Sequence, residues 1–408
     1  MSKSADDIVR EQYEAYPYPA RDPADEKKRL VVGSPSHRDE INHYCFGGRR
    51  DFRRPFRALF AGGGTGDGFV MLAQQLHDAG CPAEVVHLDI STTSQAVARA
   101  RAEMRGLTNV RFVHGSLLDA AGVAPGPWDY IDCCGVLHHL ESPAAGLAAL
   151  KSQLAADGGM GLMVYGELGR TGVYPLQTAL RTLGQGLDPA ARVAQAKNLL
   201  ASLPPTNWFA ANRFLGDHKG KSDAELYDLL LHSRDRAYTV PQLVDLLAGS
   251  GLAPTAFIAP LRYDPMAYLT DATLQARARA LPWLEQAALA ENLYGGLKTH
   301  ICYAVPAAQA ANAAARPDSP AMTPVALQSS AEALSRLFAK PVLKVDFDGH
   351  AARLDLPDGA ARLVSLCDGN RTLGQIQQAL GLDWFAFKAR FDKLWRAANG
   401  LNLMVLRA

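Results

Sequence analysis

Short apolar runs alternate with helix-like stretches between Arg57 and Val164, and this alternation restricts the fold more than any other feature. The apolar runs have strand length and little polar alternation, as expected for strands that are buried on both faces of a sheet. They lie at 58–61, 85–89, 110–115, 130–136 and 161–165. Helix-like stretches lie at 68–79, 94–105 and 144–155. The pattern predicts an α/β fold with a parallel, doubly wound sheet.

The chain continues well beyond this alternation. Residues 1–56 precede it as an N-terminal segment, with a helix predicted from Ile8 to Tyr16. Residues 166–250 are mostly helix-like and too long for an ordinary connection, so we expect a helical insertion there. Strand-like runs at 254–258 and 300–305 would complete a seven-stranded sheet in a domain spanning 57–305.

The last part of the chain has the composition of a separate module. Residues 306–325 are rich in Ala and Pro, which predicts a linker. In 326–408, Asp348-Gly349 between two alternating runs predicts a hairpin, and two or three helices follow. A strand-like run after Asn399-Gly400 would form a terminal hairpin, so we expect a small winged-helix-like domain.

Composition excludes several classes of protein. Apolar residues make up 48% of the 408 residues and the net charge is +1, which favours a folded chain without bulk attraction to nucleic acid. No apolar run reaches the roughly 18 residues that would span a bilayer. Six cysteines form no CxxC pair and no zinc-ligand pattern, so we expect no metal site and a cytoplasmic protein. Acidic Asp383 and Asp392 interrupt the one basic C-terminal helix, which disfavours nucleic acid as a partner.

The glycine-rich turn from Gly62 to Gly66 follows the first predicted strand and precedes the first helix. Such a turn lets the backbone approach a ligand and directs helix amides at its polar groups. A nicotinamide dehydrogenase would need G-x-G-x-x-G, but the third glycine is replaced by Asp67 or Phe69 in the two registers. Alone, the turn indicates only nucleotide-like binding, or a turn without any ligand.

Asp89 ends the second strand, where a carboxylate can accept both hydroxyls of a ribose. The alternative is a helix cap, for which Ser91 and Thr92 compete. Dehydrogenases and methyltransferases both use such a carboxylate, so Asp89 does not separate the two classes.

Two later strand ends favour methyltransferases. The third strand ends in His114-Gly115-Ser116-Leu117, and the fourth runs through Cys133-Cys134-Gly135 into V-L-H-H-L. With the glycine turn and Asp89, these segments resemble the ordered motifs of class I S-adenosylmethionine-dependent methyltransferases. The resemblance covers roughly 57–165 and implies a Rossmann-like fold with S-adenosyl-L-methionine as cofactor.

The resemblance also implies which residues bind the cofactor. The glycine loop would face its methionine part and ribose, Asp89 with Ile90 would hold the ribose, Ser116 and Leu117 would flank the adenine, and Cys134 and Gly135 would line the methyl-donating centre. The loop residues are Gly62, Gly63, Gly64 and Gly66. Two positions depart from the family: Phe60 and Ser116 stand where acidic residues are common.

The N-terminal sequence EQYEAYPYP (11–19) is similar to a motif of a bacterial group related to rickettsial protein lysine methyltransferases and tetratricopeptide-fused methyltransferases. Residues 228–243 are also similar to that group. The resemblance implies a protein side chain as methyl acceptor, lysine preferred. Tyr13 and Tyr18 would cover the cofactor, or they would pack as aromatic residues of an N-terminal helix.

Three residues near strand ends are candidates for the reaction itself. His138 lies just past the fourth strand, and Tyr165 and Glu167 lie at the end of the fifth. An amine must be neutral to take a methyl group, so a proton acceptor is useful there. His138 could instead be structural, and Glu167 a solvated loop residue.

Three hypotheses for function remain open. The first is a methyltransferase acting on a protein or a small molecule; the second is an interaction protein that keeps the fold without catalysis; the third is a dehydrogenase. We expect no membrane partner, and a homodimer through the C-terminal domain or the insertion is a further prediction.

Overall fold

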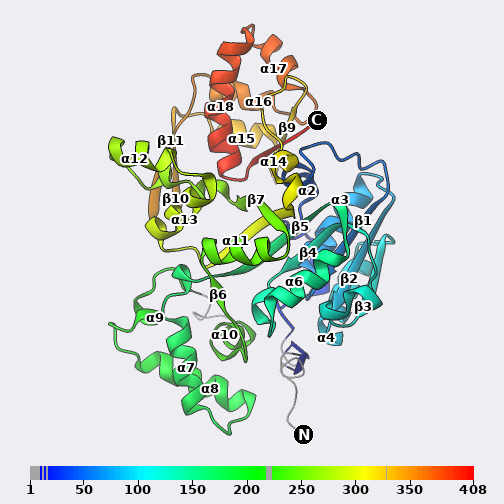
Figure 1. Cartoon of the computed structure of the whole chain (residues 1–408), viewed down its shortest axis with the longest axis vertical. Helices are drawn as coiled ribbons and strands as arrows, with labels where there is room; N and C mark the ends of the chain where they lie inside the picture. The colour runs from blue at the N-terminus through cyan, green and yellow to red at the C-terminus, as the bar shows by residue number, and fades with distance from the viewer. Residues whose placement is uncertain (1–9, 12, 15–16, 217–222, 328) are drawn as a thin grey trace.

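The computed structural model describes residues 10–11, 13–14, 17–216, 223–327 and 329–408. Its central sheet has the strand order β3-β2-β1-β4-β5-β8-β7, with the short β6 paired to β5 (Figure 1). Strands β1 to β6 pair in parallel, whereas β8 is antiparallel to both β5 and β7. The strands are β1 Phe56–Ala61, β2 Ala83–Asp89, β3 Val110–His114, β4 Trp128–Cys134, β5 Leu154–Gly166, β6 Ala237–Tyr238, β7 Leu252–Ile258 and β8 Thr299–Pro306. The predicted doubly wound sheet is confirmed.

Helices cover both faces of this sheet because successive strand residues point to opposite sides. Leu59 and Ala61 of β1 pack in one core, while Ala58 and Phe60 pack in the other. The first core is shared with α5 Ala120–Val123, α6 Pro143–Ser152, α11 Val240–Gly249 and α13 Trp283–Tyr294. The second is shared with α2 Arg38–Cys45, α3 Asp67–Asp78, α4 Thr92–Met104 and α14 Ala310–Ala313. A short helix, α12 Ala272–Arg279, precedes α13.

The predicted insertion forms a helical unit with a core of its own. Asp188 caps the N-terminus of its longest helix and Pro189 occupies the first turn, a combination that favours helix initiation there. The helices are α7 Val173–Leu183, α8 Pro189–Ser202, α9 Trp208–Ala211 and α10 Asp223–Leu226, followed by a π-helical turn Tyr227–Leu231. In Figure 1 this unit lies at the opposite end of the molecule from the C-terminal module.

The C-terminal module also has a core of its own. Its hairpin turns at Asp348 and Gly349, both with positive φ, as predicted. The expected terminal hairpin is wrong in its pairing, because β12 pairs antiparallel with β9 at the start of the module. The elements are β9 Thr323–Ala326, α15 Ala331–Leu337, β10 Val342–Phe347, β11 His350–Asp355, α16 Ala360–Ser365, α17 Leu373–Ala379, α18 Trp384–Gly400 and β12 Met404–Arg407. The winged-helix-like character of the module stays a prediction.

The segment predicted as a linker, 306–325, contains α14 and the start of β9. It lies against α2: Ala313 accepts a hydrogen bond from the Gly47 amide (2.6 Å), and the Ala315 amide donates to His43 (2.8 Å). Among the described residues, no helix is long and apolar enough to cross a membrane.

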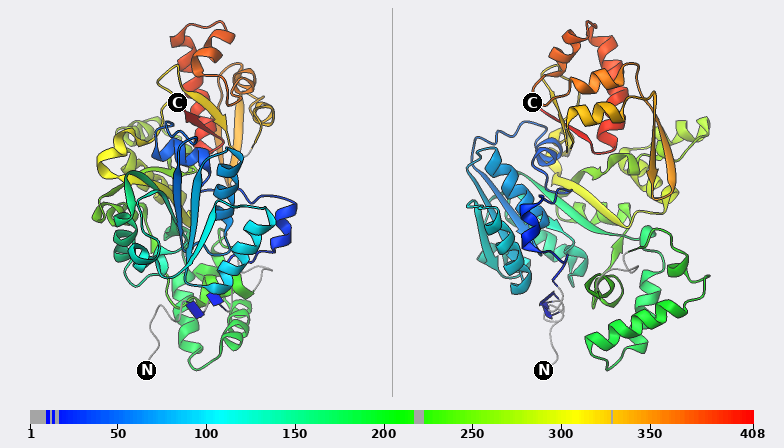
Figure 2. Two further views of the ribbon diagram at one scale, coloured as in Figure 1. Left: turned by 90° about the vertical axis from the view of Figure 1, so that its right-hand side faces the viewer. Right: turned by 180° about the vertical axis from the view of Figure 1, so that it is seen from behind.

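The N-terminal segment runs along the sheet from the end that carries the insertion to α2 beside the C-terminal module (Figure 2). The predicted helix Ile8–Tyr16 falls partly outside the described residues; of those described, Arg10, Glu11, Tyr13 and Glu14 are helical. A short 3₁₀ helix, Pro23–Lys27, follows. This segment therefore passes the carboxyl ends of the parallel strands.

Candidate active site

The glycine turn forms a tight loop between β1 and α3. Gly62, Gly64 and Gly66 have φ of 79°, 53° and 94°, a region that side chains disfavour. A Cβ at Gly62 would lie 2.4 Å from Val136, and one at Gly63 would lie 2.5 Å from the His87 ring. Gly62 is thus required both by its backbone conformation and by the lack of room for a side chain.

Asp89 fixes this loop from the end of β2. One carboxylate oxygen accepts the Gly64 amide at 2.7 Å, and the other accepts the Ser91 amide at 2.8 Å. Ser91, and not Asp89, caps α4 by accepting the Ser94 amide. Each carboxylate oxygen keeps a further lone pair for a ligand hydroxyl.

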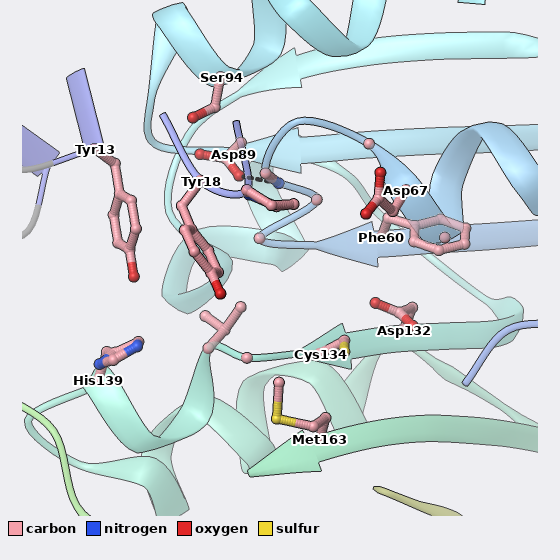
Figure 3. Close-up of a pocket in the computed structure, with 18 of the residues that line it drawn as sticks. Tyr13, Tyr18, Phe60, Asp67, Asp89, Ser94, Asp132, Cys134, His139 and Met163 are labelled. Atoms are coloured by element: carbon pink, nitrogen blue, oxygen red, sulfur yellow. Dashed lines mark hydrogen bonds between the residues drawn. The ribbon is translucent and has the colours of Figure 1, made fainter. Parts of the chain in front are cut away.

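A cavity of about 840 Å³ opens at this edge of the sheet, within the roughly 300–1,000 Å³ typical of ligand sites. Figure 3 shows Tyr13 and His139 at one end, Phe60 and Asp132 at the other, and Asp89 and Tyr18 between them. All the predicted cofactor residues line it: Tyr13, Tyr18, Gly62, Gly63, Gly64, Gly66, Asp89, Ile90, Ser116, Leu117, Cys134 and Gly135. Four strand ends and the N-terminal segment therefore converge on one space.

The N-terminal segment is held over the cavity by polar contacts along its length. Thr65 donates to the Pro19 carbonyl (2.7 Å), and Arg21 forms a two-bond ion pair with Asp67 (2.9 and 2.6 Å). Glu14 accepts the amides of Thr92 and Thr93 (2.7 and 3.1 Å) at the start of α4. Although burial opposes it, hydrogen bonds from Thr93 and Thr92 lower the pKa of Glu14 to about 2.

The end of the cavity near the insertion combines aromatic rings with a carboxylate. Tyr165 donates to Asp228 at 2.8 Å, and the Tyr13 hydroxyl lies 3.5 Å from the other oxygen of the same carboxylate. Burial, and then the Asp228 charge, raises the pKa of both tyrosines, which are therefore neutral donors. Arg170 stacks over the Tyr165 ring at 3.7 Å and pairs with Asp235 at 2.9 Å.

His139 and His232 complete this end of the site. Their ring centroids are 3.8 Å apart, and burial lowers the pKa of His139 to about 4 and holds the pKa of His232 well below its usual value. His139 Nδ1 lies 2.9 Å from the Arg234 carbonyl, so Nδ1 carries the proton and Nε2 is left as an acceptor.

One nitrogen or oxygen atom each of His139, His232 and Asp228 lie within 4.8 Å of one another, a spacing at which three side chains could hold a metal ion. However, His232 Nδ1 accepts the Arg234 amide at 3.0 Å, which leaves Nε2 protonated in the neutral ring. As arranged, the three side chains do not offer three lone pairs to a cation.

The structure does not bring His138 or Glu167 to the cavity. His138 is fully buried behind Tyr165, with ring centroids 3.9 Å apart, and Glu167 points to solvent. Leu137–His139 is a 3₁₀ turn, in which neighbouring side chains point in different directions, so that His139 and not His138 lines the cavity. Of the three predicted catalytic residues, Tyr165 alone contributes to the wall.

Sequence reasoning also missed Asp228 and Asp132. The resemblance at 228–243 pointed to the right segment, but nothing in the spacing indicated that its first residue would reach the fifth strand. Asp132 has no local signal, since it follows two apolar residues within a strand and belongs to no motif of its own.

The chain is similar in sequence and in fold to several known proteins. Residues 59–160 match the family model described as a methyltransferase domain. An uncharacterized protein of a Synechococcus strain is 32% identical over 273 residues, which is 65% of this chain and 63% of that protein. The chain thus spans less than two thirds of the length of this relative.

Solved structures of PKMT2 from Rickettsia typhi share the fold. The complex with AdoHcy has a TM-score of 0.56 at 13% identity, and a second structure has 0.55 at 12%. Each match covers 86% of this chain and 71% of PKMT2. The matched segment, residues 59–160, therefore resembles a methyltransferase domain. In its overall fold the chain is similar to rickettsial PKMT2.

Proposed function

We propose that the chain is an S-adenosyl-L-methionine-dependent methyltransferase whose acceptor is an amine, with a protein lysine as the preferred acceptor. The observation that supports this most directly is the end of the cavity where Tyr13, Tyr165, His139 and Asp228 meet. Aromatic faces with a nearby carboxylate suit an ammonium or amine better than a neutral hydroxyl.

The opposite walls fit the cofactor. The glycine loop places its backbone in the cavity wall, and Asp89 keeps acceptor capacity for ribose hydroxyls. In this arrangement Ser116 and Leu117 would flank the adenine, and Cys134 and Gly135 would lie beside the sulfur. The bound cofactor supplies an electrophilic methyl group on a sulfonium.

The residues of the chain then orient and desolvate the amine. Asp228 attracts it, and the rings of Tyr13 and Tyr165 bound its path. His139 Nε2 accepts an N–H bond, which holds the amine with its lone pair free for in-line attack. Because burial lowers the pKa of His139 to about 4, the ring stays neutral and acts only as a hydrogen-bond acceptor, and the amine gives up its proton to water as it enters the site. The N-terminal segment excludes bulk water from the same space.

The test is incubation of a cognate cell lysate with methyl-labelled S-adenosylmethionine and the purified chain. We expect label in protein, on lysine after hydrolysis, and less label with Asp89→Ala when the cofactor is limiting. Label confined to small molecules would replace the protein acceptor by a small one. Cofactor binding without any turnover would favour an interaction protein that retains the fold.

The oligomeric state and the cellular setting of the chain are also part of this proposal. Dimerisation through the C-terminal domain or the insertion stays a prediction, as does a cytoplasmic setting, which the six free cysteines support.

A further inference from the structure

Asp132 is a buried carboxylate in the wall of the cavity, at the end away from His139 (Figure 3). It lies on β4 and is the register partner of Phe60 on β1. Residues on either side of it, Ile131 and Cys133, pack in one core, whereas Tyr130 packs in the other together with Phe60. Asp132 therefore projects from the same face of the sheet as Phe60, the position where the first strand lacks an acid.

Every contact that the structure gives Asp132 is with a neutral group. Ser36 donates to its carboxylate at 2.5 Å, and the Cys134 amide donates as well. The Ser36 hydroxyl is shared with Tyr130 (2.9 Å). Within the described part of the chain, no lysine or arginine forms an ion pair with Asp132. Burial accordingly raises the pKa of this carboxyl to about 7.

Other carboxylates of the cavity are already engaged. Asp67 pairs with Arg21 and with Arg101 (2.7 Å), and Asp89 accepts two backbone amides. A buried carboxylate that faces a cavity without a counter-charge is costly unless a ligand supplies one. A cationic group of the ligand would therefore stabilise the Asp132 carboxylate.

The strand order indicates which part of the cofactor reaches it. Neighbouring strands lie about 4.8 Å apart, so the ends of β3, β2, β1 and β4 form a row. If the adenine lies by Ser116 after β3 and the ribose by Asp89 after β2, the methionine part extends over β1 towards β4. Its one permanent cation besides the sulfonium is the α-ammonium group.

We propose that Asp132 binds the α-ammonium group of the methionine part of the cofactor, and so supplies from β4 the negative charge that Phe60 does not supply from β1. The inference rests on the proposed cofactor. It assigns Asp132 to ligand binding, and Ser36 to holding its carboxylate in place.

The test compares ligands that differ at this group, by isothermal titration at pH 8, where the Asp132 carboxyl is ionised. S-adenosylhomocysteine carries the amino acid part, and 5′-methylthioadenosine lacks it. We expect Asp132→Asn to weaken S-adenosylhomocysteine about 10- to 100-fold and to leave methylthioadenosine within about twofold. Asp129→Asn, on the same strand but paired with Arg50 outside the cavity, is the matched control and should change neither.

Equal losses for both ligands, or none for either, would overturn the assignment. A second measurement needs no variant: the unaltered protein should bind S-adenosylhomocysteine about tenfold or more tightly than its deaminated analogue. Equal affinity for these two would remove the role of Asp132 alone. Failure of the unaltered protein to bind S-adenosylhomocysteine at all would remove the proposed cofactor as well.

Discussion

Asp89 shows how one side chain serves both the loop and the ligand. Its two oxygens hold the amides of Gly64 and Ser91, and its remaining lone pairs face the cavity. The loop conformation and the ligand contact therefore depend on the same carboxylate.

We expect Asp89→Ala to weaken S-adenosylhomocysteine binding by roughly 1–3 kcal/mol, since two hydroxyl contacts and the order of the loop are lost together. Titration calorimetry measures this directly. Unlike the Asp132 variant, it should weaken methylthioadenosine to a similar degree, because both ligands carry the ribose. Unchanged affinity would mean that Asp89 acts on the loop alone.

The two adjacent histidines offer a paired experiment. His138 is buried, and neither of its ring nitrogens has a hydrogen-bond partner among the described residues. His138→Phe therefore removes two unsatisfied atoms and keeps the stacking on Tyr165. We expect this variant to keep turnover and to be as stable as the parent or more so. His139→Phe should lower kcat by about 10²-fold with little change in cofactor affinity. Steady-state kinetics with the labelled cofactor would show the difference, and equal loss in both would contradict it.

The cofactor side of the site was predictable because it depends on strand ends. In a parallel sheet these ends meet at one edge, so Gly62, Asp89, Ser116 and Cys134 could be brought together from their positions in the chain. The acceptor side was not, because the direction of His139 depends on a 3₁₀ turn and Asp228 arrives from the insertion. Asp132 could not be predicted from the sequence, because its position beside Phe60 depends on the pairing of β4 with β1.

At the scale of elements, buried ion pairs hold the N-terminal segment against α4. Glu26, almost fully buried, accepts from Arg101 at 2.7 Å and also pairs with Arg105. Arg101 in turn bonds the Thr65 carbonyl (2.8 Å) of the glycine loop. The segment and the loop therefore share an anchor on α4. The sequence predicted that this segment would cover the cofactor. It did not predict the ion pairs of Glu26, because their partners lie 75 and 79 positions further along the chain.

Glu26→Gln should cost about 1.5–3 kcal/mol, because Arg101 keeps Asp67 as a counter-charge but loses a charged hydrogen-bond partner. Urea denaturation measures the loss, and a faster release of S-adenosylhomocysteine should accompany it. Arg21→Ala is the matched control, since its ion pair with Asp67 is about one third exposed and is worth at most about 1 kcal/mol. Comparable losses in the two variants would argue against an anchor at Glu26.

At the scale of the whole molecule, α2 joins the sheet to the C-terminal module. Glu40 accepts from Tyr303 of β8 (2.7 Å) and from Asn402 (2.7 Å). Next to it, His43 Nδ1 accepts the Leu406 amide of β12 (3.0 Å). The buried ring is neutral, because burial lowers the pKa of His43 to about 4.

This makes the stability of the chain sensitive to acid. The folded pKa values of His43 and His139 lie near 4, below the unfolded value of about 6.5, so their contribution is complete above pH 6.5 and is lost as the pH falls towards 4. Each is worth roughly 3 kcal/mol. Asp132 acts in the opposite sense, because its raised pKa penalises the folded state as the pH rises from about 4 to 7.

We expect the melting temperature to fall between pH 6.5 and 4.5, since the buried histidines, with lowered pKa values, outweigh the buried carboxyls Asp132, Glu40 and Asp235, whose pKa values are raised. His43→Gln should flatten this profile, because the amide has no proton to gain. Scanning calorimetry across the pH range provides the measurement. A melting temperature independent of pH, or the same slope in His43→Gln, would contradict the assignment.

The contact between α2 and β12 also bears on how the chain reaches its native state during synthesis. His43 and Leu406 are 363 positions apart, and the Ala408 amide bonds the Gly48 carbonyl at 2.8 Å. The ribosome must therefore synthesise β12 before α2 finds this partner. Since domains otherwise fold as they emerge, α2 packs on the sheet first, and a nascent chain stalled short of Met404 would leave the buried His43 ring without its bond to the Leu406 amide.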